Sequence, residues 1–153
     1  MAKKQNVNSV ELYYEFENVH QLLSETETQL LLALTNFVES PTFNSLRTVF
    51  SQSQAFVEKG ISVKERNLSF GGKIDFAYED KNKLNIVDWK LGGTSESQDT
   101  LQLISYALLV SEEFGYAPGR IDLHQAHLAS NQISSFCIGE NDLLRSKISL
   151  FKT

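Results

Sequence analysis

Two carboxylates and a lysine whose types and spacing could do chemistry lie in two neighbouring predicted strands. Asp75 lies in the first segment, residues 73–79, and Asp88 and Lys90 lie in the second, residues 84–90. A polar turn joins the two, so we expect a β-hairpin in which Asp75 reaches the same place as Asp88. Because strand side chains alternate with a period of two, Asp88 and Lys90 share one face.

These residue types point to metal-dependent chemistry. Two facing carboxylates repel each other, and a divalent cation relieves that repulsion. Mg²⁺ prefers oxygen ligands and often takes only one or two protein carboxylates. Bound Mg²⁺ lowers the pKa of its water and polarises a phosphoryl oxygen, while Lys90 would orient or help deprotonate the attacking water. The pattern predicts phosphodiester hydrolysis, although D-x-K alone is also typical of a structural Asp88–Lys90 ion pair with Asp75 exposed.

A predicted helix over residues 97–115 follows the hairpin. It opens with the capping-box sequence S-E-S-Q at residues 95–98 and ends near Gly115. Gln102 and Tyr106 are four residues apart and therefore share a face. They could hold a phosphate or orient the lysine, or they could be a core tyrosine and its neighbour. A different, apolar face is expected to carry Leu101, Ile104, Ala107, Leu108 and Phe114.

The whole chain, residues 1–153, is predicted to form a single domain with a helical N-terminal third. Within residues 1–52, one helix over about 25–39 opens with a capping box at residues 24–27, and a short helix opens with Ser40 and Pro41. The sheet core is expected over residues 54–139. Its expected strands are 55–63, with an irregularity at Gly60, then a hairpin over 70–90, and then 120–129 and 132–138. In the hairpin, Ile74, Phe76 and Tyr78 are expected to share one face. A C-terminal helix is expected over residues 140–153.

Composition excludes several protein classes. The net charge of −5 argues against bulk electrostatic coating of nucleic acid, although half of the basic residues lie between positions 59 and 90. No apolar run is long enough for a membrane span, and the first residues lack the apolar region of a secretory signal, so we expect a cytoplasmic protein. The single cysteine, Cys137, is expected to be buried and cannot form an internal disulfide. His124 and His127 are expected to be structural or surface residues.

The motifs together resemble those of the PD-(D/E)XK nuclease superfamily, specifically its RecB-like branch. The matching segments are Gly72-Lys73-Ile74-Asp75, Ile86 to Lys90 with Gly92, and Gln102 to Ala107. The resemblance covers residues 54–129. It implies an α/β, restriction-endonuclease-like fold, with a mixed β-sheet core in αβββαβ order that is flanked by helices.

The resemblance also implies a role for each matching residue. Asp75 and Asp88 would be metal ligands together with the backbone carbonyl of Trp89, and Lys90 would be the catalytic lysine. The glutamine and tyrosine of the following helix would support the site and contact DNA.

Two upstream residues extend the resemblance. His20, in V-H-Q-L-L, is similar to the histidine ligand of the branch, although Glu17 stands where the family has glycine. A lone helical histidine can equally be structural or exposed. Glu58 is similar to the strand glutamate of the family, and Glu65 is the competing candidate.

The resemblance thus implies a Mg²⁺- or Mn²⁺-dependent deoxyribonuclease, a RecB-like exonuclease or an enzyme that processes single strands or duplex ends. We expect no iron–sulfur cluster, because the cysteines that would hold one are missing from the sequence. No P-loop motif is present, so we expect any helicase or other repair or recombination partner to be a separate chain. The alternatives are a non-cleaving DNA-binding or assembly module of a helicase–nuclease complex, and a restriction-type enzyme. The sequence does not decide whether the substrate is DNA or RNA, or whether the enzyme acts as an exonuclease or an endonuclease.

Overall fold

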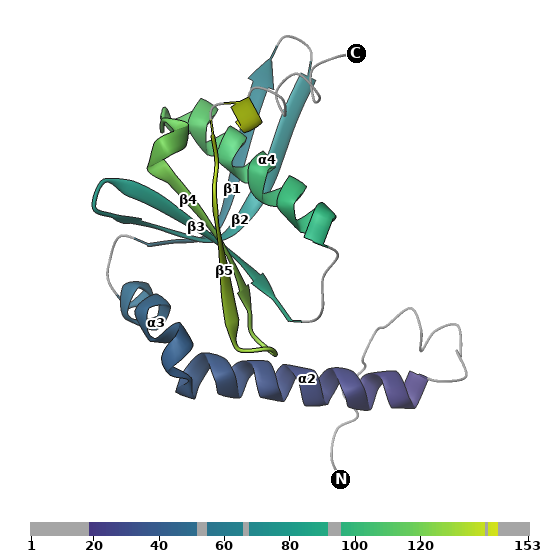
Figure 1. Cartoon of the computed structure of the whole chain (residues 1–153). Coiled ribbons are helices and arrows are strands. Elements are labelled where there is room, and N and C mark those ends of the chain that lie inside the picture. Colours follow the sequence, from purple (N-terminus) through teal and green to yellow (C-terminus); the bar gives the residue numbers. More distant parts are fainter. Residues whose placement is uncertain (1–18, 52–54, 66–67, 92–95, 140, 144–153) are drawn as a thin grey trace.

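A mixed five-stranded β-sheet with helices on both faces forms the protein (Figure 1). The computed structural model describes residues 19–51, 55–65, 68–91, 96–139 and 141–143. In chain order, the elements are α2 (Val19–Glu39), the 3-10 helix η1 (Pro41–Phe43), α3 (Asn44–Phe50), β1 (Ala55–Glu65), β2 (Leu68–Asp80), β3 (Lys83–Lys90), α4 (Glu96–Phe114), the 3-10 helix η2 (Pro118–Arg120), β4 (Ile121–His127) and β5 (Gln132–Cys137).

The strands lie in the sheet in chain order, β1-β2-β3-β4-β5. The β3–β4 pair is parallel, and the other neighbouring pairs are antiparallel. Parallel neighbours need a long crossover, and α4 provides it by crossing one face of the sheet (Figure 1). The predicted mixed α/β sheet in αβββαβ order is confirmed, with β5 added at one edge.

Two hydrophobic clusters cover the two faces of the sheet. On the α4 face, Ile74, Ile86 and Leu123 pack against Leu103 and Ala107 of the helix. On the opposite face, the members are Phe43, Leu46, Phe76, Val87 and Ala126, with the partly buried Phe37 and Trp89 packed against them. Neighbouring residues of β3 therefore serve different cores, so the strand that carries Asp88 is buried on both faces.

β1 and β2 share an irregularity at Glu58 and Asp75, which their register would place opposite each other. The pairs on either side, Val57–Phe76 and Lys59–Ile74, belong to the ladder. Glu58 has a φ of +54°, which few non-glycine residues adopt. The predicted irregularity at Gly60 is wrong, because Gly60 pairs regularly with Lys73.

The alternation of β2 side chains between the two faces of the sheet is interrupted at this irregularity. Ile74 packs in the α4 cluster, whereas Phe76 and Tyr78 pack on the opposite face. The expectation that these three side chains share one face is wrong, because the strict alternation on which it depended is interrupted at Asp75.

The N-terminal helices differ in part from the prediction. Residues 24–27 lie inside α2, where the Ser24 carbonyl accepts a hydrogen bond from Thr28 Oγ1, so the predicted capping box does not start this helix. The prediction at Ser40 is confirmed, since Ser40 Oγ accepts from the N–H of Thr42 and Pro41 begins η1. Arg47 then donates to the carbonyl groups of Phe37 and Ser40, which ties α3 to the end of α2.

The buried face of α4 also differs from the prediction. Leu101 and Phe114 are 64% and 48% exposed, and the fully buried positions include Leu103, Leu109 and Val110. Ile104, Ala107 and Leu108 pack in the α4 cluster as predicted, so the prediction is wrong only for Leu101 and Phe114. The apolar residues of this helix extend around much of its circumference, so periodicity alone does not fix the buried side. The end at Gly115 is confirmed, with φ +72°. Ser95, the first residue of the predicted capping sequence at 95–98, lies outside the described residues, as does most of the predicted helix over 140–153.

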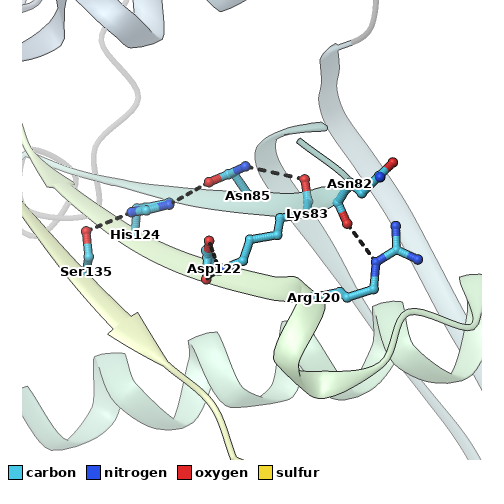
Figure 2. Close-up of polar contacts among 7 residues, drawn as sticks. All are labelled: Asn82, Lys83, Asn85, Arg120, Asp122, His124 and Ser135. Atoms are coloured by element: carbon cyan, nitrogen blue, oxygen red, sulfur yellow. Dashed lines mark hydrogen bonds and ion pairs between the residues drawn. The ribbon is translucent and has the colours of Figure 1, made fainter. Parts of the chain in front are cut away.

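A polar network occupies the opposite face at the other end of β3 and β4 (Figure 2). His124 contacts Ser135 Oγ through Nδ1 at 2.9 Å and Asn85 Oδ1 through Nε2 at 3.0 Å. Asp122 pairs with Lys83 at 2.9 Å. His124 is thus a structural residue, as expected.

Cys137 is exposed, which corrects the prediction that it is buried. It ends β5, an edge strand, and its neighbour Phe136 takes the position that packs against the α4 cluster. Among the described residues, no helix combines the length and apolar character needed to cross a membrane.

Candidate active site

The site begins where β2 and β3 separate. Their ladder ends at the pair Phe76–Val87, and Asp75 and Asp88 are the next residues along the two strands. Beyond the ladder, the backbone N–H of Trp89 donates a hydrogen bond to Asp75 Oδ2, with an N···O distance of 3.2 Å. The two carboxylates are therefore held across from each other at the end of the hairpin pairing.

Asp88 lies deep in the protein. It is 2% exposed, and its Oδ2 lies 2.8 Å from Lys90 Nζ, whose side chain is 17% exposed. Removing an ion pair from water costs several kcal/mol per ion, which the mutual attraction of the charges only partly offsets. A buried carboxylate and ammonium beside a second carboxylate are therefore better explained by chemistry than by stability.

Helix α4 extends this ion pair by two hydrogen bonds. Lys90 Nζ donates to Gln102 Oε1 at 3.0 Å, and Gln102 Nε2 donates to the Tyr106 hydroxyl oxygen at 2.8 Å. Burial raises the pKa of Tyr106, the hydrogen bond from Gln102 opposes this, and the negative charges of Asp75 and Asp88 raise the pKa further. Tyr106 therefore remains a neutral phenol that accepts from Gln102 at neutral pH. Of the predicted pair Gln102 and Tyr106, Gln102 thus contacts the lysine, and Tyr106 holds Gln102 and is also a core residue.

Gly72 makes room for this arrangement. A Cβ atom at this position would lie 3.1 Å from Tyr106 Cε1 and 3.4 Å from Leu109 Cδ1. A side chain here would press on the ring that ends the Lys90–Gln102–Tyr106 chain. The glycine of the G-x-x-D motif is therefore required for packing between β2 and α4.

A family model for the PD-(D/E)XK nuclease superfamily matches residues 4–141. The chain belongs to this superfamily. A search of curated proteins gave no significant match. PD-(D/E)XK nucleases typically use divalent metals such as Mg²⁺, although some members of the superfamily are inactive.

The donor set of this PD-(D/E)XK site fits a hard divalent cation. Asp75 and Asp88 supply two carboxylates, and Mg²⁺ commonly takes one or two with waters and substrate phosphate completing its shell. Within the described ranges, no three His, Cys, Asp or Glu side chains gather closely enough to hold a metal by themselves. The two aspartates would therefore hold the ion with open positions for substrate, and the role of the Trp89 carbonyl stays a prediction.

The described structure does not bring His20 to these carboxylates. His20 is exposed in the first turn of α2. The contacts of α2 with the rest of the fold are made farther along the helix, where Phe37 packs against Trp89 of β3 and Asn36 donates hydrogen bonds to the carbonyl groups of Leu128 and Ala129 in the β4–β5 turn. Because a helix rises about 1.5 Å per residue, Asn36 lies about 24 Å along the helix from His20. A ligand role for His20 stays a prediction.

Glu58 and Glu65 lie at different points of β1. Glu58 is level with Asp75, but its exposed side chain forms an ion pair with Lys73. Glu65 is the last residue of β1 and pairs with Leu68, far along the strand from Asp75. Only Glu58 therefore lies opposite a site residue, and its role also stays a prediction.

The sequence interpretation did not place two residues of β4 near the site, since it left Gln125 out and assigned His127 as a structural or surface residue. Gln125 is in register with Asp88, and His127 is in register with Lys90. Paired residues of parallel strands point to the same face, so both belong to the surroundings of the site. They lie outside the PD-(D/E)XK motif, and only the β3–β4 register, which sequence periodicity does not report, brings them there.

Proposed function

We propose that the protein is a Mg²⁺- or Mn²⁺-dependent deoxyribonuclease that hydrolyses phosphodiester bonds. One observation carries the proposal: Asp75, Asp88 and Lys90 converge where the β2–β3 ladder ends, and α4 contacts the lysine through Gln102. A site that had lost catalysis would have no physical reason to keep this buried ion pair beside a second carboxylate. The same charges argue against the alternative of a non-cleaving module.

The chain contributes positioned charge to this reaction. Asp75 and Asp88 would hold the divalent ion, which when bound acidifies a water and polarises the phosphoryl group. Lys90 is held between the Asp88 carboxylate and the Gln102 amide oxygen. Its positioned ammonium would stabilise the negative charge that develops on a phosphate bound beside it. Tyr106 in turn holds Gln102, which limits the freedom of the lysine.

We further propose RecB-like action on single strands or duplex ends, in concert with a helicase or another repair or recombination protein. The support is the Q-x-x-x-Y pair of α4 and its contact with Lys90. Bulk charge gives little attraction for DNA, because the chain has a net charge of −5, and Lys73 and Lys83 are paired with Glu58 and Asp122. Association with DNA would therefore depend on the site itself or on a partner.

Cleavage of labelled linear DNA tests the proposal. Purified protein is incubated with single-stranded and double-stranded substrates in Mg²⁺, in Mn²⁺ and in EDTA, and a covalently closed circle is included. We expect metal-dependent cleavage of linear DNA and an intact circle. Cleavage of the circle would overturn the exonuclease proposal, and a protein that binds DNA but never cuts with either metal would favour the non-cleaving module.

A further inference from the structure

Gln125 is a buried glutamine on β4 whose amide has an unused donor. It is 5% exposed, and among the described residues its Nε2 has no hydrogen-bond partner. A buried donor without an acceptor carries the full cost of its desolvation. Such a group lowers stability, so its presence in a packed interior points to an acceptor supplied from outside the protein.

The position of Gln125 places this donor beside the site. Along β4, Leu123 packs in the α4 cluster and Ala126 packs on the opposite face. Gln125 is two residues after Leu123 and therefore faces α4, as its register partner Asp88 does. Adjacent strands are about 4.8 Å apart, and a glutamine side chain is one methylene longer than an aspartate. The amide therefore lies on the α4 side of the sheet, on the strand next to the Asp88 carboxylate.

The chemistry of the donor limits what it binds. An amide N–H₂ offers two donors and no lone pair for a cation, so a divalent metal is not its partner. An anionic oxygen is the strongest acceptor for it. Next to Asp88 and Lys90, the anionic oxygen that the proposed reaction brings is a non-bridging oxygen of the phosphodiester.

We propose that Gln125 is a further substrate-binding residue, whose Nε2 donates a hydrogen bond to a non-bridging oxygen of the DNA phosphate bound beside Asp88 and Lys90. The inference rests on the proposed function, because it requires a phosphodiester at this place. It adds a third strand, β4, to a site otherwise built from β2, β3 and α4.

Two substitutions separate substrate binding from a structural role. Gln125→Leu removes the donor at similar volume, and Gln125→Glu replaces it with a carboxylate. Affinity for a fluorescent single-stranded oligonucleotide is measured in Ca²⁺, whose flexible coordination still suits two carboxylates. Because a hydrogen bond to a charged group is lost, we expect Gln125→Leu to bind about 10-fold to 100-fold more weakly. Gln125→Glu is expected to bind at least as weakly, because it repels the phosphate.

Thermal unfolding supplies the second readout. Gln125→Leu removes an unsatisfied buried donor, so its Tm is expected to rise by about 2–4 °C, whereas loss of a structural hydrogen bond would lower it. Gln21→Leu is the control, because Gln21 is exposed on α2 and bonds only to Glu25 among the described residues; both readouts are expected to stay at wild-type values.

The outcomes distinguish this inference from the nuclease proposal. If wild type cuts DNA and Gln125→Leu binds it with unchanged affinity, the inference is wrong and the nuclease proposal stands. If Gln125→Leu lowers the Tm, or weakens Mn²⁺ binding in the absence of DNA, Gln125 is structural or acts through Asp88, and the inference is also wrong. A wild type that neither binds nor cuts DNA would overturn both.

Discussion

The backbone N–H of Trp89 donates a hydrogen bond to the carboxylate of Asp75 at the point where β2 and β3 stop pairing. This contact turns Asp75 toward β3, one residue beyond Asp88. The Trp89 ring lies on the opposite face, 5.5 Å from the Phe37 ring and 5.8 Å from the Phe76 ring. The second core of the protein therefore holds the residue that orients the first carboxylate.

Divalent metal should stabilise the folded protein through the two aspartates. A ligand at 100 times its dissociation constant adds about 2.7 kcal/mol to the free energy of unfolding. We therefore expect Mn²⁺ or Mg²⁺ to raise the Tm of wild type, and Asp75→Asn to abolish most of the increase. Thermal scans with and without metal make the measurement, and Asp142→Asn, a substitution of an exposed carboxylate 67 residues farther along the chain, is the control. An equal shift in Asp75→Asn would contradict metal binding at this position.

The Lys90–Gln102–Tyr106 chain should behave as one unit. Tyr106→Phe removes one hydrogen bond and should cost about 0.5–1.5 kcal/mol of stability with a modest loss of cleavage. Gln102→Leu removes both bonds and should lower cleavage further, by about tenfold or more. Because the residues act in series, the double variant should resemble Gln102→Leu alone, and a double-mutant cycle of cleavage rates measures this. Fully additive effects would mean that Tyr106 does not act through Gln102.

Two glycines of the β1–β2 hairpin offer a matched pair of substitutions. At Gly72 an added Cβ would press on Tyr106, so Gly72→Ala should destabilise the protein by about 1–3 kcal/mol and weaken cleavage. At Gly60 no heavy atom lies within 4 Å of the added Cβ, so Gly60→Ala should be neutral or stabilise by up to about 1 kcal/mol. Chemical denaturation compares the two. Equal changes in the free energy of unfolding would show that the close approach of Gly72 to Tyr106 does not affect stability.

His124 should make stability depend on pH on the acid side. Burial lowers its pKa below the ordinary 6.5, and nearby Asp122 only partly opposes this. As the pH falls below 6.5 the unfolded chain takes up the proton first, so the free energy of unfolding falls, by at most about 1.4 kcal/mol per pH unit, until the folded His124 is also protonated. The neutral ring can donate from Nε2 to Asn85 and accept at Nδ1 from Ser135 (Figure 2).

Denaturation of wild type and His124→Gln between pH 5 and pH 8 tests this prediction. The stability of wild type relative to the variant should fall toward acid pH, because only wild type carries the titrating ring. Parallel curves would contradict the assignment of the acid-side loss to His124.

Sequence patterns predicted the parts of the fold that depend on local chemistry. Alternation and the polar turn predicted the β2–β3 hairpin, Ser40-Pro41 predicted the start of η1, and Gly115 predicted the end of α4. The mixed sheet was implied by the resemblance to the PD-(D/E)XK superfamily, with which the predicted order of elements agrees. The positions of Asp75, Asp88 and Lys90 followed from the hairpin, because adjacent strands bring residues together by simple counting.

Features that depend on tertiary packing were not predictable in this way. The change of face at Asp75 arises from an irregularity shared by two strands, and no period in β2 alone reports it. Gln125 joins the site only through the parallel β3–β4 register, which the crossover through α4 sets. Cys137 is exposed because β5 is an edge strand, although cysteine is often buried.

The most direct test of the central claim compares two lysines. Lys90→Met removes the ammonium between Asp88 and Gln102, and Lys73→Met removes one that pairs with Glu58 on the surface. With linear DNA and Mg²⁺, we expect Lys90→Met to lose cleavage by about 10²-fold to 10³-fold, the usual effect of removing a group that stabilises transition-state charge. Lys73→Met should cut DNA within about twofold of wild type. Undiminished cleavage by a folded Lys90→Met variant would contradict the account.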